Sequence, residues 1–169
     1  RGIIYMAYRS LVLAASLLAM PAAAEVVQFQ GHAVEVDGAS DARRVVAMRS
    51  GRYSIPGSPQ QVVGKVQACL GRADSGAGIV SVDAANGLLR AVSRTGYRHD
   101  GEARMLRGRW TVEAGEGGMQ IAVADLAHIH DEGIDESYLP VPMREDEGWE
   151  RALAAVIEVE HALLDCMYR

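Results

Sequence analysis

The sequence predicts an α+β fold: a two-layer sandwich in which an antiparallel meander sheet of four to six strands carries two helices on one face. Two observations predict it. Turn signals at 86–87, 99–101 and 115–118 separate consecutive strand-like segments in the middle of the chain. Apolar residues recur at helical spacing before and after these segments, over 58–70 and 147–167. Strands that follow one another directly and are flanked by helices are typical of α+β domains.

The N-terminal segment has the three parts of a secretory signal peptide. A basic residue precedes the apolar run 11–20, a proline follows the run, and small residues end at Ala24. We therefore leave residues 1–24 out of the fold, and we interpret 1–5 as lying upstream of a true start at Met6. The alternative is that the apolar run forms a buried helix of the domain. The run has about half the length that crosses a bilayer, so we expect no stable membrane insertion after cleavage.

Composition and export together restrict the class of protein. The remaining chain suits one domain, in which strands of 25–57 join the sheet and 58–169 form its helix–meander–helix core. Without the two arginines of the leader, the formal net charge changes from −5 to −7. An acidic domain is a poor partner for nucleic acid, whose phosphates require a basic surface. We expect a periplasmic or secreted bacterial protein. The chain contains no P-loop and no G-x-S-x-G motif, so we predict no cofactor and favour a non-enzymatic protein.

The first elements are predicted from local patterns. Residues 26–37 alternate loosely and end in an Asp-Gly turn, which predicts one strand. Residues 42–55 contain a β-branched run and predict a second strand with an irregularity at Gly51. A helix is expected to begin at Ser58, which can cap the free amide groups, with Pro59 at the first helical position. Its apolar stripe consists of Val62, Val63, Val66, Cys69 and Leu70.

The meander follows as four predicted strands, over 79–83, 88–97, 104–114 and 119–130. In the third strand Trp110 alternates with Arg107 and Arg109, so we assign the Trp110 face to the core and the arginine face to solvent. In the fourth strand, strict alternation places Leu126 on the face opposite Ile121 and Val123. The polar, proline-containing segment 131–146 is predicted to be a loop, and 147–167 is predicted to be the longest helix.

This order of elements resembles a family of exported bacterial domains of unknown function. The resemblance consists of a helix, the segment Ile79-Val-Ser-Val-Asp-Ala-Ala-Asn-Gly-Leu-Leu, a longer strand, a Trp-bearing strand, a last strand and a C-terminal helix. It covers 58–167, and its most specific part is the hairpin from Asp83 to Leu89. Those domains have a fold similar to the TATA-box-binding protein, so the resemblance implies such a fold here. It provides no catalytic residues and does not imply DNA binding.

The two cysteines, Cys69 and Cys166, are predicted to form a disulfide. An even number of cysteines in an exported chain most simply pairs. Each cysteine lies in the last turn of a predicted helix, so the bond requires both helices to end side by side on the same face of the sheet. The spacing does not fit a C-x-x-C redox pair. Other interpretations are a zinc site, for which only His161 lies near a cysteine, and a nucleophilic Cys69 if the thiol is free.

His128 and His130 form the one pattern with metal-ligand character. His-x-His on a strand directs both imidazoles to the same face, and carboxylates of 131–136 could complete a site. This pattern supports an alternative function, a metal-binding protein or a metal-dependent hydrolase centred on the two histidines. The other interpretation is a polar strand end that continues into a solvated acidic loop.

Arg90, Arg94, Arg107 and Arg109 lie on neighbouring predicted strands, on the face opposite Trp110. A basic stripe on an acidic protein is a candidate surface for a protein partner or a small anionic ligand. The leading hypothesis is therefore an exported, non-enzymatic binding or interaction domain that uses its open sheet face. The alternative is a solvated face on which the arginines form cross-strand pairs with acids such as Glu113.

Overall fold

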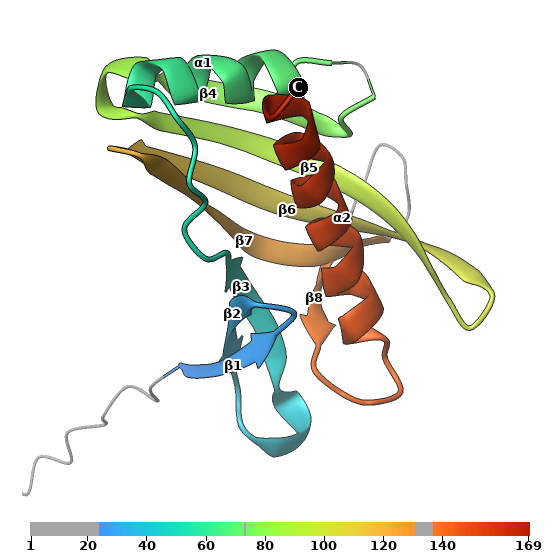
Figure 1. Ribbon diagram of the computed structural model, residues 1–169. Helices are drawn as coiled ribbons and strands as arrows, with labels where there is room; N and C mark the ends of the chain where they lie inside the picture. The colour runs from blue at the N-terminus through green and yellow to red at the C-terminus, as the bar shows by residue number, and fades with distance from the viewer. Residues whose placement is uncertain (1–23, 73, 131–136) are drawn as a thin grey trace, which may run out of the picture.

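The computed structural model describes residues 24–72, 74–130 and 137–169. Over these residues, one eight-stranded antiparallel sheet has the strand order β1-β2-β3-β8-β7-β6-β5-β4. Both α-helices lie on the same side of this sheet, and the second crosses it obliquely (Figure 1). The predicted α+β class is confirmed. The predicted number of four to six strands is wrong, for two reasons given below.

The elements have the following bounds. The strands are β1 (Glu25–Phe29), β2 (His32–Asp37), β3 (Arg44–Arg49), β4 (Ala77–Asp83), β5 (Leu88–His99), β6 (Glu102–Gly115), β7 (Gly118–His130) and β8 (Ser137–Pro142). The helices are α1 (Pro59–Leu70) and α2 (Trp149–Met167), and short 3₁₀ turns cover Ser40–Ala42 and Ala84–Asn86. The predicted strands at 79–83, 88–97, 104–114 and 119–130 correspond to β4 to β7.

The first additional strand comes from a hairpin inside 26–37. Gln30 and Gly31 have φ values of 47° and 80°, and Phe29 pairs with His32 across them. Two consecutive residues with positive φ make a tight hairpin turn that matches the twist of the strands. The segment predicted to be one strand is therefore the β1–β2 hairpin, because Gln-Gly is a weaker turn signal than the Asn-Gly found later in the chain.

The second additional strand is β8, inside the segment predicted to be a loop. Pro140 lies opposite Ala127 of β7, and Pro142 lies opposite Arg44 of β3. Proline removes a backbone donor and normally argues against a strand between two neighbours. The strands β3 and β7 pair directly at Ala47 and Ala124. Beyond this point they diverge, and the short strand β8 lies between them and pairs with both. This arrangement depends on long-range pairing, so the local prediction of a loop was wrong.

A bulge in β7 changes which face each later residue occupies. Asp125 and Leu126 together oppose the single residue Gly108 of β6, and Asp125 has a φ of 50°. One extra residue in a strand reverses the alternation beyond it. Leu126 therefore lies in the core at 3% exposure, on the same face as Ile121 and Val123. The prediction that Leu126 lies opposite these two residues was wrong for this reason.

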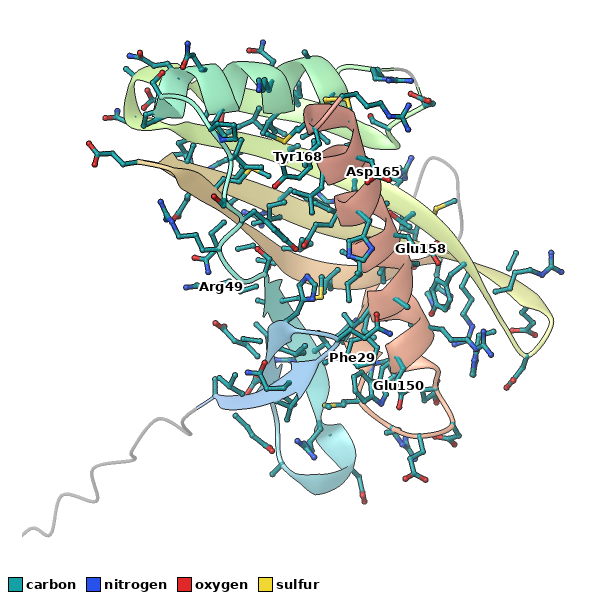
Figure 2. All side chains as sticks on the ribbon, viewed as in Figure 1. Phe29, Arg49, Glu150, Glu158, Asp165 and Tyr168 are labelled. Carbon is teal, nitrogen blue, oxygen red and sulfur yellow. A yellow bond between two sulfur atoms is a disulfide. The ribbon has the colours of Figure 1, made fainter. Side chains whose placement is uncertain are left out.

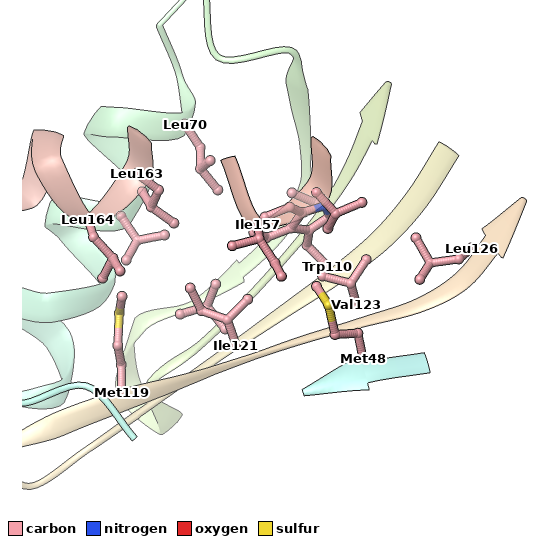
Figure 3. Close-up of a cluster of buried hydrophobic side chains, with 14 of the residues drawn as sticks. Met48, Leu70, Trp110, Met119, Ile121, Val123, Leu126, Ile157, Leu163 and Leu164 are labelled. Carbon is pink, nitrogen blue, oxygen red and sulfur yellow. The ribbon is translucent and has the colours of Figure 1, made fainter. Parts of the chain in front are cut away.

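The core lies between the helices and the face that carries Trp110. Trp110 is 1% exposed, and its indole N–H donates to the Ser93 hydroxyl at 2.7 Å, which satisfies the polar atom that burial would otherwise penalise. Figure 3 shows Trp110 between β7 residues such as Val123 and Ile157 of α2. Gly108 lies two residues before Trp110, where an added Cβ would lie 2.7 Å from a side-chain carbon of Val123. The predicted core face of β6 is confirmed.

The start of α1 follows from its capping residues. The Ser58 hydroxyl accepts from the Gln61 amide at 3.3 Å, and the Gln61 side chain accepts from the Ser58 amide at 2.8 Å, so the two residues form a capping box. Pro59 occupies the first helical position. The capping box turns the chain onto the sheet, with Val62, Val63 and Val66 buried against it.

A disulfide joins the C-terminal ends of the two helices. Cys69 and Cys166 are bonded at 2.02 Å, with their Cα atoms 6.0 Å apart. This is the predicted pairing, and it brings α1 and α2 together on one face of the sheet (Figure 1). No helix in the described part of the chain is long and apolar enough to cross a membrane.

Candidate functional site

The four predicted arginines lie on one face of two paired strands, opposite the helices. In the register of β5 and β6, Arg94 is directly opposite Arg107, and Arg90 is opposite Thr111. Arg109 alternates with the buried Trp110 and therefore shares this face. We call the surface formed by the side chains of Arg90, Arg94, Arg107 and Arg109 the arginine face. Two like charges directly opposite each other in a sheet repel, so this arrangement costs folding energy unless other groups offset it.

Two partners hold arginines of this face in place. The guanidinium carbon of Arg107 lies 4.7 Å from the ring centre of Tyr138 on β8, a distance at which a cation is attracted to an aromatic ring. Arg109 forms an ion pair with Asp125, the bulged residue of β7. Both side chains of that pair are more than half exposed, so the pair contributes little to stability.

The structure adds a fifth arginine that sequence analysis did not find. Arg49 of β3 pairs in register with Ala122 of β7, which in turn lies opposite Thr111 of β6. Arg49 is therefore on the open side of the sheet, it is exposed, and in Figure 2 it extends away from α2. Between Arg49 and the arginine face, β7 presents the short side chains of Ala122 and Ala124. No sequence signal predicts this neighbour, because the pairing of β3 with β7 is long-range.

Glu113 does not neutralise the arginine face. It lies opposite Leu88 of β5 and Gln120 of β7, at the far end of β6. Within the described residues, Glu113 forms no ion pair with the arginines, and Asp125 is the acid that pairs with Arg109. Glu113 therefore does not supply the cross-strand pair of the alternative interpretation, but Asp125 of the neighbouring strand does, so the interpretation of a solvated face with cross-strand pairs stays open.

The two histidines of the metal hypothesis have different environments. His128 is 8% exposed on the helix side of β7, and its Nε2 atom lies 2.6 Å from the Tyr97 hydroxyl, whereas His130 is exposed. Their ring centres are 6.5 Å apart. Burial, followed by the positive charges of Arg104 and His130, lowers the pKa of His128. Among the described residues no three His, Cys, Asp or Glu side chains are grouped to hold a metal ion. The acids at 131–136 lie outside the described residues, so the metal hypothesis stays a prediction.

A buried carboxylate is the main polar feature of the core. Glu160 of α2 is fully buried, and its Oε1 atom lies 2.9 Å from Nε2 of His32 on β2. The Tyr53 hydroxyl donates to the same oxygen, and Oε2 has no partner. Burial and the hydrogen bond to Glu160 raise the pKa of Tyr53. These contacts attach the N-terminal strands to α2. The sequence signal was present, because Glu160 is the one acid on the apolar stripe of this helix.

Comparisons with known proteins support the fold. No family model matches the chain, and no curated relative matches it. The chain is similar to the crystal structure of a TBP-like protein from Parabacteroides distasonis, with a TM-score of 0.55 and 10% identity over 73% of this chain and 92% of that one. It is also similar to a DUF4468 family protein from Bacteroides ovatus, with a TM-score of 0.50 and 14% identity over 76% and 90% of the two chains.

These two structures confirm the predicted resemblance to bacterial domains with a fold like that of the TATA-box-binding protein. At 10% and 14% identity the likeness shows the fold alone. Proteins that share a fold use it for unrelated functions, so any function has to be argued from the residues of this chain.

Proposed function

We propose that this protein is an exported, non-enzymatic binding domain whose arginine face receives an acidic segment of another protein. The observation that carries the proposal is the direct opposition of Arg94 and Arg107, with Arg90 and Arg109 beside them, on a chain of net negative charge. A partner that supplies carboxylates complements this concentration of positive charge. Guanidinium groups bind carboxylates through paired, charge-assisted hydrogen bonds, which makes acidic side chains the matching chemistry.

The shape of the surface favours a protein segment over a small anion. Small ligands bind in concave sites that surround most of their surface. The arginine face is instead the open side of a sheet, and the alanines of β7 separate it from Arg49. A segment with several carboxylates can engage both groups of positive charge at once, whereas one small anion can engage only one of them.

Export is part of the proposal and rests on two independent features. The first is the leader-like pattern over 1–24. The second is the disulfide between Cys69 and Cys166, because structural disulfides persist in oxidising compartments such as the periplasm and are rare in the cytosol.

A labelled decaglutamate peptide tests the proposed surface directly. The mature domain should increase the fluorescence anisotropy of this peptide in low salt, and the affinity should fall as salt is added. Changing Arg107→Glu together with Arg109→Glu should weaken binding more than tenfold, since each exposed ion pair contributes about 0.2–1 kcal/mol and reversal adds repulsion.

The matched control reverses two exposed arginines outside the open face of the sheet, Arg72→Glu and Arg151→Glu, and changes the net charge equally. The control pair should retain most of the affinity of the parent. Equal losses of peptide affinity in the two double variants would show that net charge alone explains the effect, and this would overturn the assignment of this face. Absence of saturable binding by the parent would overturn it as well. Thermal unfolding of all three proteins verifies that they are folded.

A further inference from the structure

A second candidate site lies at one end of the sheet, apart from the arginine face. A cavity of about 510 Å³ is lined by the ends of β6, β7 and β8 and by Glu147, which precedes α2. Its apolar lining includes Met105, Leu139 and Pro140, and its polar lining includes Arg104 and His128. This size and mixture are typical of sites for small organic molecules.

Two polar side chains of the cavity lining, Arg104 and His128, come from adjacent strands, and Tyr97 of the next strand lies beside both of them. Tyr97 of β5 lies directly opposite Arg104 of β6, and His128 lies on the neighbouring strand β7, opposite Leu106. The Tyr97 hydroxyl is 2.6 Å from Nε2 of His128. Burial raises the pKa of Tyr97, and the Arg104 guanidinium beside the hydroxyl opposes that rise. The cluster is therefore compact, and each member restrains the next.

The Arg104 guanidinium beside the Tyr97 hydroxyl can only donate, so we assign the hydroxyl proton to the contact with Nε2 of His128. If Nε2 of the neutral ring accepts this hydrogen bond, the ring proton lies on Nδ1. Nδ1 has no hydrogen-bond partner among the described residues, and it is not among their fully buried unpartnered atoms. This atom is therefore a donor that remains open to a ligand.

Arg104 is anchored at one nitrogen and keeps donors available at others. Its Nη1 atom donates to the backbone carbonyl of Glu147 at 3.1 Å, and its Nη2 atom lies 4.0 Å from a carboxylate oxygen of Glu102. Glu102 is largely exposed, so it screens the guanidinium only weakly. Glu147 also lines the cavity, and its carboxylate adds negative charge there, which disfavours a multiply charged anion.

We propose that this cavity binds a small monocarboxylate with an apolar body, whose carboxylate is received by Arg104 and Nδ1 of His128. The apolar lining accommodates the body, and the two donors select the charged end. The site is independent of the arginine face, so either proposal can fail without the other.

The test uses hexanoate, its neutral analogue hexanamide, and inorganic phosphate as probes. Amide NMR spectra of the oxidised mature domain should shift saturably with hexanoate at residues around the cavity, with a Kd of about 1 mM for a ligand of this size. Hexanamide should bind at least tenfold more weakly, and phosphate should cause no saturable shift at these residues. Arg104→Met should abolish hexanoate binding, whereas Arg72→Met, a change at a distant exposed arginine, should leave it unchanged.

Long-range proton–nitrogen correlations of His128 provide a second measurement that does not need a variant. They should show the proton on Nδ1 in the free protein, with a change in the Nδ1 shift when hexanoate is added. Binding of hexanoate and hexanamide with equal affinity, no saturation with hexanoate, or a neutral ring protonated on Nε2 would each overturn the proposal. If Arg104→Met unfolds, Arg104→Lys replaces it and should weaken binding, because a single ammonium cannot reproduce the fork of the guanidinium.

Discussion

Replacing both cysteines, Cys69→Ser with Cys166→Ser, removes the covalent link between the ends of α1 and α2. The two residues are 97 positions apart, so the bond closes a loop that contains β4 to β8 and most of α2. The chain-entropy relation gives about 4.7 kcal/mol for a loop of about this length, and loss of a native disulfide typically costs about 2–5 kcal/mol. Both cysteines are only half-buried, so the smaller oxygen atoms change packing little.

Urea unfolding followed by circular dichroism measures this loss. We expect the free energy of unfolding to fall by about 2–5 kcal/mol and the slope against urea to rise, because the unlinked chain exposes more surface when unfolded. The corresponding fall in Tm is about 6–15 °C for a domain of about 145 residues. A reductant should lower the parent to the level of the double variant and leave that variant unchanged. A double variant within about 1 kcal/mol of the oxidised parent would refute the loop-entropy reasoning.

Three further predictions concern the core and the cavity. Glu160→Ala should cost about 3–5 kcal/mol in urea unfolding, because it leaves His32 buried without its carboxylate; additive losses in the double-mutant cycle of these two residues would show that they do not interact. Gly108→Ala should cost about 1–3 kcal/mol, because the added carbon would overlap a core valine. Gly64→Ala, on the exposed side of α1, should instead stabilise the protein by up to about 1 kcal/mol. A higher Tm for Gly108→Ala than for Gly64→Ala would contradict this. Burial lowers the pKa of His128, so the unfolded chain binds more protons, and stability should fall as the pH drops below the ordinary value of 6.5; a His128→Phe variant with the same pH profile as the parent would contradict this assignment.

Elements with local signals were predicted well from sequence. The capping box at Ser58 specifies the start of α1 within four residues, and the turn at Gly87, with a φ of 66°, joins β4 to β5. The core face of β6 followed from the alternation around Trp110. In each case the residues that determine the conformation are neighbours in the chain, so no knowledge of the tertiary structure is needed.

The remaining strands depend on contacts that a local pattern does not contain. The strand β8 includes two prolines and is stabilised by pairing with both β3 and β7. A propensity argument cannot anticipate such pairing, because it assigns those prolines to a loop. The β1–β2 hairpin was not predicted for a different reason. Its turn requires a positive φ at Gln30, and residues other than glycine rarely adopt a positive φ.

The same distinction applies to the candidate sites. Arg90, Arg94, Arg107 and Arg109 lie on strands joined by short turns, and such turns fix the register, so the shared face was predictable. Arg49 reaches the same side only through the pairing of β3 with β7, which joins segments more than 70 residues apart. The cavity at His128 needs residues of three strands and of the segment before α2, so no spacing in the sequence reveals it.

One inserted residue in β7 connects the two proposed sites. Asp125 projects to the open side of the sheet, where it pairs with Arg109 and limits the positive charge of the arginine face. The same bulge shifts the alternation beyond it, so that His128 lies on the helix side, within reach of Tyr97. If the same residues continued through Asp125 with regular alternation and no bulge, His128 would lie on the side of the arginines, and Leu126 would lie on the open side. The bulge therefore places a charged outer surface and a cavity of mixed lining on opposite faces of a single strand, which is why alternation alone could not predict the cavity.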